Sequence, residues 1–397
     1  MWEIANWLHF LVFFFVFYKS ANVGLFSLKI QESGNLKGLF GDFAGAIKDF
    51  DRAIELNPRS QSSLLARALA KMKMREYDGC AKDLELAEKI SASTEVYIGR
   101  GSLKKALGDL DGAFKEFSKA LQIDKSNVVA FQNRGGIELE RGNARLALDD
   151  LNVAERLDPG NPITLQQRGV AKRLCGDLSG SLKDLNSALT SFPGNVVALQ
   201  QRGITKHMLY HFDALDDFNE ADQLQPRSPL TIGHRAICKY KMYSIEIIEK
   251  HQLPSIDQDL EYAHSLLPND PDIIYYLACV KNNLNQNEKA IELLNQGLDL
   301  RPNDAVFIYK RGLVYRDLSN LEKYQTDIKR AIQMEPTQPT TLQLRGILRR
   351  ENGDLEGSLK DLTKAFEGRK DWFSLFQTAV TRKYQVRSGR WKICCRV

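Results

Sequence analysis

An arginine recurs along this chain, and an acidic residue follows it at a nearly fixed distance. Arg134 and Asp150, sixteen residues apart, are one example, and six of the pairs have this spacing. A guanidinium and a carboxylate at one repeated spacing can form paired hydrogen bonds, or the guanidinium can bind an acidic ligand. The arginines are Arg67, Arg100, Arg134, Arg168, Arg202, Arg235, Arg311 and Arg345, and the acids are Asp83, Glu116, Asp150, Asp184, Asp217, Asp259, Asp327 and Asp361.

One copy of the pattern has lost both partners together, because Leu277 and Leu293 stand where the arginine and the acid are expected. Removing one member of a buried ion pair costs about 3–5 kcal/mol, whereas replacing both members by apolar groups can be neutral. The joint loss therefore predicts that the two residues pair within one repeat. Arginines that bind an acidic ligand are the alternative.

Metal and catalytic chemistry have weak support. His207 and His211 lie four residues apart, a spacing that suits zinc on a helix, but no glutamate stands between them and no third ligand is evident. The six cysteines include no CxxC pair, so we expect reduced thiols. The sequence has no phosphate loop, nucleophile elbow or carboxylate dyad. We expect no enzymatic activity, no cofactor and no metal.

The arginines recur because the sequence repeats with a period of 34, and we count ten units between residues 27 and 372. Each unit has a small residue in a first helix, an alanine in a second helix, and in most units a closing proline. Small residues let two helices approach closely, glycine followed by Asp or Asn separates them, and proline ends the second helix. Representative columns are Gly135, Gly169 and Gly203, then Ala120, Ala154 and Ala188, then Pro159, Pro193 and Pro226.

The chain resembles the tetratricopeptide repeat family over residues 27–372, and the segment GDFAGAIKDFDRAIELNP (residues 41–58) is similar to the family's second helix. The resemblance implies an all-α fold in which antiparallel helix pairs stack into a right-handed superhelix with a concave groove. One helix pair cannot bury its apolar face alone, so stacking is required.

The repeats divide the chain into five parts. Residues 1–26 are a hydrophobic amino-terminal segment, 27–228 hold six repeats, and 229–270 hold a seventh with an insertion. Ala221 and Ala263 are 42 residues apart instead of 34, so this insertion is either a longer helix or loop, or a joint between two blocks. Residues 271–372 hold three repeats, and 373–397 hold an expected capping helix and a basic tail.

By resemblance, other positions of the first helices line the groove, where amides, cations and tyrosines suit a partner's peptide or helix. A merely solvated face is the alternative at each position. The candidates are Gln132, Gln166, Gln200, Gln343, Lys105, Arg173, His207, Arg316, Arg350, Tyr240, Tyr275 and Tyr309.

We expect a non-enzymatic scaffold that binds another protein. Family members that act as co-chaperones clamp a carboxylate with Lys and Asn residues. Here only Asn35 matches that clamp, while Gln31, Ala66, Glu95 and Gly99 replace the remaining four positions. The same repeats would also suit a regulatory or targeting subunit of an enzyme complex, or a repeat protein that reads RNA.

The charge distribution argues against nucleic acid as a partner. The net charge is +5, and residues 373–397 alone contribute +6, so the rest of the chain is close to neutral.

The apolar run in residues 1–26 is short for a membrane span and lacks the basic start of a signal peptide. We expect a cytoplasmic protein, with a membrane anchor and cytoplasmic repeats as the alternative.

Overall fold

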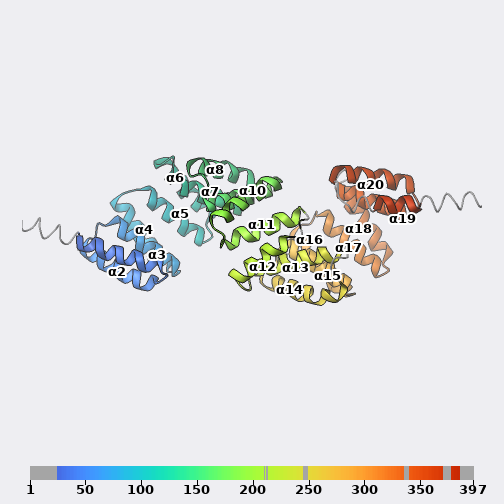
Figure 1. The fold of residues 1–397 in the computed structure, drawn as a ribbon, viewed down its shortest axis with the longest axis horizontal. Helices are drawn as coiled ribbons and strands as arrows, with labels where there is room; N and C mark the ends of the chain where they lie inside the picture. The colour runs from blue at the N-terminus through green and yellow to red at the C-terminus, as the bar shows by residue number, and fades with distance from the viewer. Residues whose placement is uncertain are drawn as a thin grey trace, which may run out of the picture. The chain divides into compact units, whose positions relative to one another are not determined.

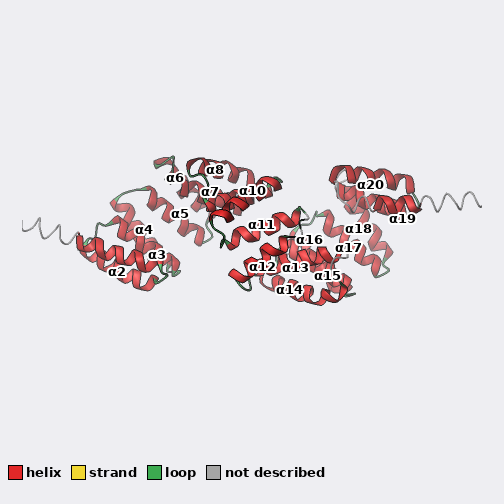
Figure 2. Ribbon diagram, viewed as in Figure 1, coloured by secondary structure: helices red, strands yellow, loops and turns green. Residues whose placement is uncertain are grey.

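The computed structural model describes residues 25–209, 211, 213–244, 249–334, 339–369 and 377–384. Regular secondary structure over these residues is helical and includes no strand (Figure 2). The helices follow one another in pairs, so the expected all-α architecture of helix pairs is confirmed (Figure 1). The chain divides into two compact units, which we call unit 1 (Met1–Leu209) and unit 2 (Tyr210–Val397).

Unit 1 contains helix pairs in which odd-numbered helices come first and even-numbered helices second. A helix over residues 25–39 pairs with α2 (Phe43–Leu56). The pairs that follow are α3 (Gln61–Lys73) with α4 (Tyr77–Ile90), α5 (Thr94–Ala106) with α6 (Leu110–Ile123), α7 (Val128–Glu140) with α8 (Ala144–Leu157), and α9 (Pro162–Leu174) with α10 (Leu178–Ser191), and then α11 (Val196–Met208).

Unit 2 begins with α12 (Ala214–Leu224), so the division of the chain falls inside the sixth repeat and not at the insertion. The insertion lengthens α13 (Pro229–Ser244) and adds a 3-10 helix (Lys250–Gln252) before α14 (Leu253–Leu266). The remaining pairs are α15 (Pro271–Asn283) with α16 (Asn287–Leu300), α17 (Ala305–Asp317) with α18 (Leu321–Met334), and α19 (Pro339–Glu351) with α20 (Leu355–Arg369).

The turn inside each pair has a local cause. Gly108 has a φ of 82° and Gly176 a φ of 89°, a left-handed conformation that glycine adopts without strain and that ends the first helix. The next residue caps the second helix, since the Asp109 carboxylate accepts a hydrogen bond from the Gly112 backbone N–H at 2.8 Å. Sequence pattern and turn geometry therefore agree.

The small-residue column lets the helices of a pair pack closely. A Cβ atom added at Gly101 would lie 2.7 Å from the Phe117 ring, and one added at Gly169 would lie 2.8 Å from Leu185. Both distances are too short for a real side chain, so a larger residue would force the pair apart. The alanine column is buried throughout the described second helices that carry it, which places it in the core.

Among the residues that the structure describes, five repeats show the predicted ion pair. In each, the arginine of the first helix donates two hydrogen bonds to the aspartate of the second, with N–O distances of 2.5–2.9 Å. These guanidinium groups are directed into the stack and not toward an acidic ligand. The pairs are Arg67 with Asp83, Arg134 with Asp150, Arg168 with Asp184, Arg311 with Asp327, and Arg345 with Asp361.

The same arginines also contact the preceding repeat. A further nitrogen of Arg67 donates to Asp51 at 2.7 Å, and one of Arg311 donates to Asn295 at 2.7 Å. Each acceptor lies on the preceding second helix, sixteen residues before the arginine. One guanidinium therefore joins three consecutive helices and fixes each first helix between two second helices.

Two repeats depart from the predicted pairing. Arg100 donates to Glu88 of the preceding second helix and lies 3.7 Å from Glu116. Arg235 donates to Asp222 at 2.8 Å and does not pair with Asp259, because the insertion between α13 and α14 shifts the register of the second helix.

The repeat that lacks the pair is apolar at both positions. Leu277 is buried, and Leu293 packs against the same cluster of buried residues. This arrangement agrees with the prediction that both members of the pair are replaced together.

A second cation four residues after the arginine was not predicted. Lys71 donates to Asp83 at 2.8 Å, and Lys104 donates to Glu116 at 2.9 Å. Lys172 lies 2.8 Å from Asp184, so the arrangement recurs. The carboxylate of the second helix therefore binds two turns of the first helix.

The helix over residues 377–384, which we call the capping helix, packs against the last repeat of unit 2. Arg350 donates to Gln377 at 2.8 Å, as Arg173 donates to Gln201 in unit 1. The Ser358 hydroxyl lies 3.4 Å from that of Thr381, as Ser181 and Thr205 do at 3.2 Å. The cap therefore makes the contacts that a further first helix would make.

The amino-terminal apolar segment, residues 1–24, lies outside the described residues, as do residues 385–397 of the basic tail. None of the helices in the described ranges carries an apolar stretch long enough to span a bilayer.

Removing Asp150 alone should be costly, because it leaves the half-buried Arg134 guanidinium without its partner. We expect Asp150→Ala to lower the free energy of unfolding by about 2–4 kcal/mol, and the double variant Arg134→Leu/Asp150→Leu to recover most of that loss. Urea denaturation followed by circular dichroism measures both. Exposed Asp149→Ala is the control, expected within about 0.5 kcal/mol of wild type. A double variant that is less stable than Asp150→Ala would contradict the pairing.

The stability of unit 1 should fall in mild acid through Glu116. Burial raises its pKa, but the hydrogen bond from Lys104 and the charges of Arg100, Lys104 and Lys119 bring that pKa below its usual value. A lowered pKa means that the ionised form stabilises the fold above the unfolded pKa of about 4.3, and that this contribution is lost as pH falls. Thermal unfolding between about pH 6 and pH 3 should be less pH-dependent in Glu116→Gln than in wild type. Equal slopes for the two proteins would contradict this assignment.

Candidate functional site

The first helices of unit 1 lie next to one another and form a continuous surface. Helices α5, α7, α9 and α11 contact their neighbours in that order. Because the period is constant, a given position of the repeat recurs at the same place on each helix. We call this surface, formed by α5, α7, α9 and α11, the unit 1 face.

The predicted glutamine column lies between repeats and not on an open surface. The Gln132 amide donates to Thr164 at 2.7 Å and to Asn161 at 3.2 Å, and Asn161 caps α9. Gln166 accepts from Asn195, the cap of α11, at 3.0 Å. Each amide therefore fastens one first helix to the start of the next.

The other two glutamines are also enclosed. Gln200 is 6% exposed and Gln343 is 5% exposed, so neither presents its amide to a partner as expected. For Gln132 and Gln166 the difference arises because the next first helix contacts this position, which a single repeat does not reveal.

Polar side chains from three helices converge at the centre of the unit 1 face. Lys105 of α5 lies 2.7 Å from Glu140 of α7. Gly136 leaves room beside them, since a Cβ atom there would lie 3.3 Å from the Gln167 amide nitrogen and 3.9 Å from the Lys105 ammonium. The Gln167 carbonyl oxygen is buried and accepts no hydrogen bond. An acceptor left in this state costs about 1–3 kcal/mol.

The carboxyl-terminal turns of α9 and α11 carry the next predicted residues. Arg173 donates to Gln201 at 2.9 Å, which joins the two helices, and His207 is half-buried on α11. His211 is exposed after α11. Among the described residues no cluster of three His, Cys, Asp or Glu side chains could hold a metal ion.

A row of exposed aliphatic residues on the unit 1 face was missed by the sequence analysis. Val129, Ile163 and Val197 are the second residues of α7, α9 and α11, and they are 47%, 54% and 46% exposed. The 34-residue spacing is visible in the sequence, but valine and isoleucine at a periodic position were indistinguishable from core residues. We call these three residues the aliphatic row.

A row of amides runs beside the aliphatic row. Asn133, Gln167 and Gln201 follow its members by four residues, so they lie on the same side of each helix. All three are half-buried, and Asn133 donates to the Val129 carbonyl of its own helix at 2.8 Å. We call these three residues the amide row.

In unit 2 the predicted tyrosines form part of an aromatic cluster on the first helices. Tyr240 is 9% exposed, and its hydroxyl accepts a hydrogen bond from Asn283 at 3.1 Å. Burial raises its pKa above the usual value, so the phenol stays neutral. Tyr275 packs edge-on against Tyr276 and Phe307, with ring centroids 5.2 and 5.5 Å away. The main contribution of Tyr240 and Tyr275 is therefore to the packing of unit 2.

The last predicted residues lie in different surroundings. Tyr309 is half-buried, and Arg316 is exposed with a guanidinium nitrogen 3.6 Å from Asp317. Arg350 holds the capping helix through Gln377. Arg316 therefore remains an exposed cation on the first helices of unit 2, whereas Arg350 binds the helix over residues 377–384.

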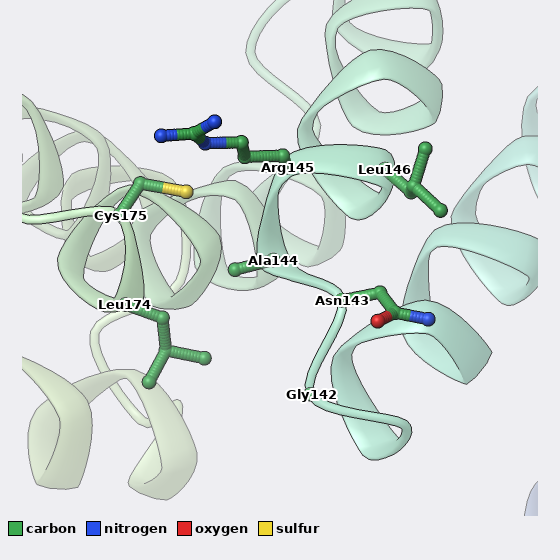
Figure 3. Close-up of a pocket in the computed structure, with 7 residues that line it drawn as sticks. All are labelled: Gly142, Asn143, Ala144, Arg145, Leu146, Leu174 and Cys175. Atoms are coloured by element: carbon green, nitrogen blue, oxygen red, sulfur yellow. The ribbon is translucent and has the colours of Figure 1, made fainter.

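A shallow hollow of about 430 Å³ lies elsewhere on unit 1 (Figure 3). The turn before α8, the start of α8 and the end of α9 form it, and its Cys175 thiol is free and exposed. No buried charged group converges on it, so we assign it no ligand. Its lining residues are Gly142, Asn143, Ala144, Arg145, Leu146, Leu174 and Cys175.

Two helix pairs match a known repeat family. Residues 94–127, which contain α5 and α6, and residues 271–304, which contain α15 and α16, match the sequence model of the tetratricopeptide repeat. The chain is a tetratricopeptide repeat protein. Tetratricopeptide repeats indicate a scaffold for protein–protein interaction, and such scaffolds typically carry no catalytic activity.

Similar proteins support the fold of this tetratricopeptide repeat protein. RNA polymerase II-associated protein 3 of Xenopus tropicalis is 29% identical over 101 residues, which is 25% of this chain and 15% of that protein. The chain is also similar to an IFIT1 monomeric mutant with Gppp-AAAA, at 17% identity and a TM-score of 0.55, covering 93% of this chain and 90% of the other. For the human IFIT1 dimer with PPP-AAAA these values are 17%, 0.51, 85% and 89%. Identities this low establish the fold only.

The glutamine contacts predict a measurable difference between two neighbouring amides. Gln132→Ala removes both hydrogen bonds to the start of α9, so we expect a loss of about 1–2 kcal/mol in the free energy of unfolding. Asn133→Ala removes only a contact to its own helix and should stay within about 0.5 kcal/mol of wild type. Urea denaturation of the two variants measures the difference, and equal effects would contradict the structural role of Gln132.

Proposed function

We propose that this chain is a non-enzymatic scaffold and that the unit 1 face binds a segment of a partner protein. The aliphatic row carries this proposal, because three exposed branched side chains at one position of consecutive helices are an unusual use of a solvent-facing site. The amide row beside it supplies polar groups, Lys105, Glu140 and Arg173 supply charge at the far end of the same helices, and His207 adds a polar ring there. Apolar contacts rimmed by polar groups are typical of protein interfaces.

The first helices of unit 2 are a second part of the proposal. Tyr275, Tyr309 and Arg316 remain candidate contact residues there, because tyrosine and arginine are the residue types that most often form hot spots of protein interfaces. The unit 1 face is the stronger candidate, since its apolar residues are exposed while Tyr240 is buried.

A co-chaperone that clamps a carboxylate is less well supported. Gln31 accepts hydrogen bonds from Ser62 and Ser63, so it is engaged within the stack where a lysine is needed. Exposed Glu95 stands where a cation is needed, and an acid repels a carboxylate ligand. A regulatory or targeting subunit of an enzyme complex is compatible with the same face, because its catalytic partner would be another chain.

RNA is the second ligand class to test, because the IFIT1 structures contain Gppp-AAAA and PPP-AAAA. In this chain the repeated arginines of the first helices are occupied by aspartates of the second helices. Without the basic tail the chain is close to neutral. Both features favour a protein partner over a polyanion.

The proposal is tested by selecting peptides on the full chain and then changing one side chain. From a random library of segments of about twelve residues, displayed on phage, we expect binders that lose at least about tenfold in affinity with Ile163→Asp, because the charge is placed where an apolar side chain docks. Fluorescence anisotropy of synthetic copies measures this loss.

The matched control is Leu146→Asp, which places the same charge on an exposed leucine (56% exposed) of the second helix α8. It should leave the affinity unchanged. Peptides that bind wild type and Ile163→Asp equally, or a library that yields only sequences sensitive to Leu146→Asp, would contradict the proposal. So would tight, salt-dependent binding of a tetra-adenylate that Ile163→Asp abolishes.

A further inference from the structure

We propose that the apolar run of residues 7–18 packs against the helix over residues 25–39 and so covers the amino-terminal end of unit 1. The run takes the place that a preceding second helix takes beside the later first helices of this unit. This inference is independent of the partner-binding proposal, because it concerns the end of the stack and not the unit 1 face.

The helix over residues 25–39 leaves large apolar side chains exposed at its carboxyl-terminal end. Leu36 is 56% exposed, Leu39 is 82% exposed, and Phe40 in the turn that follows is 87% exposed. Neighbouring apolar side chains in water are unfavourable, and a patch of them marks a surface that another element covers. We call these three residues the end patch.

Leu36 occupies a position that is buried in the repeats that follow. It lies 34 residues before Ala70, and the same column continues with Leu103, Ile137 and Ala171. These four side chains are 1%, 7%, 0% and 0% exposed. The exposure of Leu36 is therefore a consequence of its place at the end of the stack and not of its position in the repeat.

Leu28 on the same helix is the opposite case. It precedes Gly34 by six residues, as Val129 of the aliphatic row precedes Gly135. Val129 is 47% exposed although repeats lie on both sides of it. Leu28 and Leu36 are both 56% exposed, but Leu36 lies where a neighbouring repeat packs and Leu28 does not.

A preceding second helix covers this position in the later repeats. Ala70 clusters with Ala46 and Phe50 of α2, which precede it by 24 and 20 residues. Two further clusters have the same intervals, and they are Ala113 and Phe117 with Ile137, and Ala147 and Leu151 with Ala171. The column therefore predicts that apolar residues 24 and 20 places before Leu36 cover it.

Residues 1–24 lie outside the described part of the chain, but their sequence supplies these residues. The positions 24 and 20 before Leu36 are Val12 and Val16, and both belong to the apolar run of residues 7–18. The second helices α2, α6 and α8 have 14 residues each, and four residues connect α2 to α3. The length of residues 1–24 is therefore sufficient for one such helix and its connection.

Two lysines limit the extent of the contact. Lys29 occupies the column of Ala130, which is 0% exposed, but Lys29 itself is exposed. Ala130 clusters with Ala120, ten residues earlier, and the residue ten places before Lys29 is Lys19. Like charges in one contact repel, so the contact ends before Lys29 and is centred on the end patch.

The short connection favours this run over the other surfaces that would cover the end patch, which are a second copy of the chain and a lipid bilayer. A segment that is joined to the helix by a few residues is present at a high effective concentration at any protein concentration. A run of twelve residues is also short for a bilayer span. We therefore place the contact within one chain.

The experiment uses the full chain with one cysteine in the run and one in the helix. In the variant Val16→Cys/Leu36→Cys, a short bismaleimide should join the two thiols within a single chain. Trypsin cleaves after Lys19 and Lys29, so mass spectrometry detects the product as two linked peptides. The matched control is Val16→Cys/Leu28→Cys, because Leu28 and Leu36 are equally exposed. The yield with Leu36→Cys should be at least about fivefold higher, because docking raises the local concentration of the two thiols.

Each other outcome contradicts the proposal. Equal yields at the two positions would show that the run has no fixed place on the helix. Links between two chains in the single variant Leu36→Cys would assign the end patch to a second copy. Flotation of the chain with phosphatidylcholine vesicles, together with loss of the Val16–Leu36 link, would assign the run to a bilayer.

Hydrogen–deuterium exchange gives a second measurement that needs no added cysteine. Val16→Asp places a charge in the proposed apolar contact, so backbone exchange in residues 30–39 should be at least about tenfold faster than in the wild-type chain. Unchanged exchange in these residues would overturn the proposal.

Discussion

The arginine that most first helices carry is the contact on which the arrangement of this protein depends. Its guanidinium binds the aspartate of its own second helix and a side chain of the preceding second helix, as Arg67 does with Asp83 and Asp51. Three helices are thereby fixed by one planar group whose hydrogen bonds have a defined direction. Apolar packing drives the helices together, but it allows sliding and rotation that a fork of hydrogen bonds does not.

Because the first helices are held in a fixed orientation, the same position of consecutive repeats lies side by side and forms a continuous surface. The glutamines at the helix–helix contact and the lysines four residues after the arginines add to the same constraint, as the Gln132 and Lys172 contacts show. An exposed position of one first helix therefore recurs at the same place on the next first helix. The exposed valines and isoleucine of the aliphatic row are an example. A partner that contacts several rows gains affinity from each, and this is the physical advantage of a repeat scaffold over an isolated site.

The sequence predicted the features that depend on one repeat at a time. Its period predicted helix pairs, its glycines predicted turns such as Gly176, and the joint loss at Leu277 and Leu293 predicted pairing. Features that depend on two repeats were not predicted. Gln132 was expected on an open face because its contact, the cap of α9, lies 29 residues away, and the exposed aliphatic row could not be distinguished from core before the stack was known.

The account rests on a ligand that lies across consecutive first helices of unit 1, and hydrogen–deuterium exchange of the full chain with and without a phage-selected peptide tests this most directly. The account predicts slower exchange in α7, α9 and α11, because bound ligand suppresses the local opening of the helices that it joins. It also predicts unchanged exchange in the second helices' outer turns and in α15 and α17. Protection confined to the second helices, or to the hollow at Cys175, would contradict it.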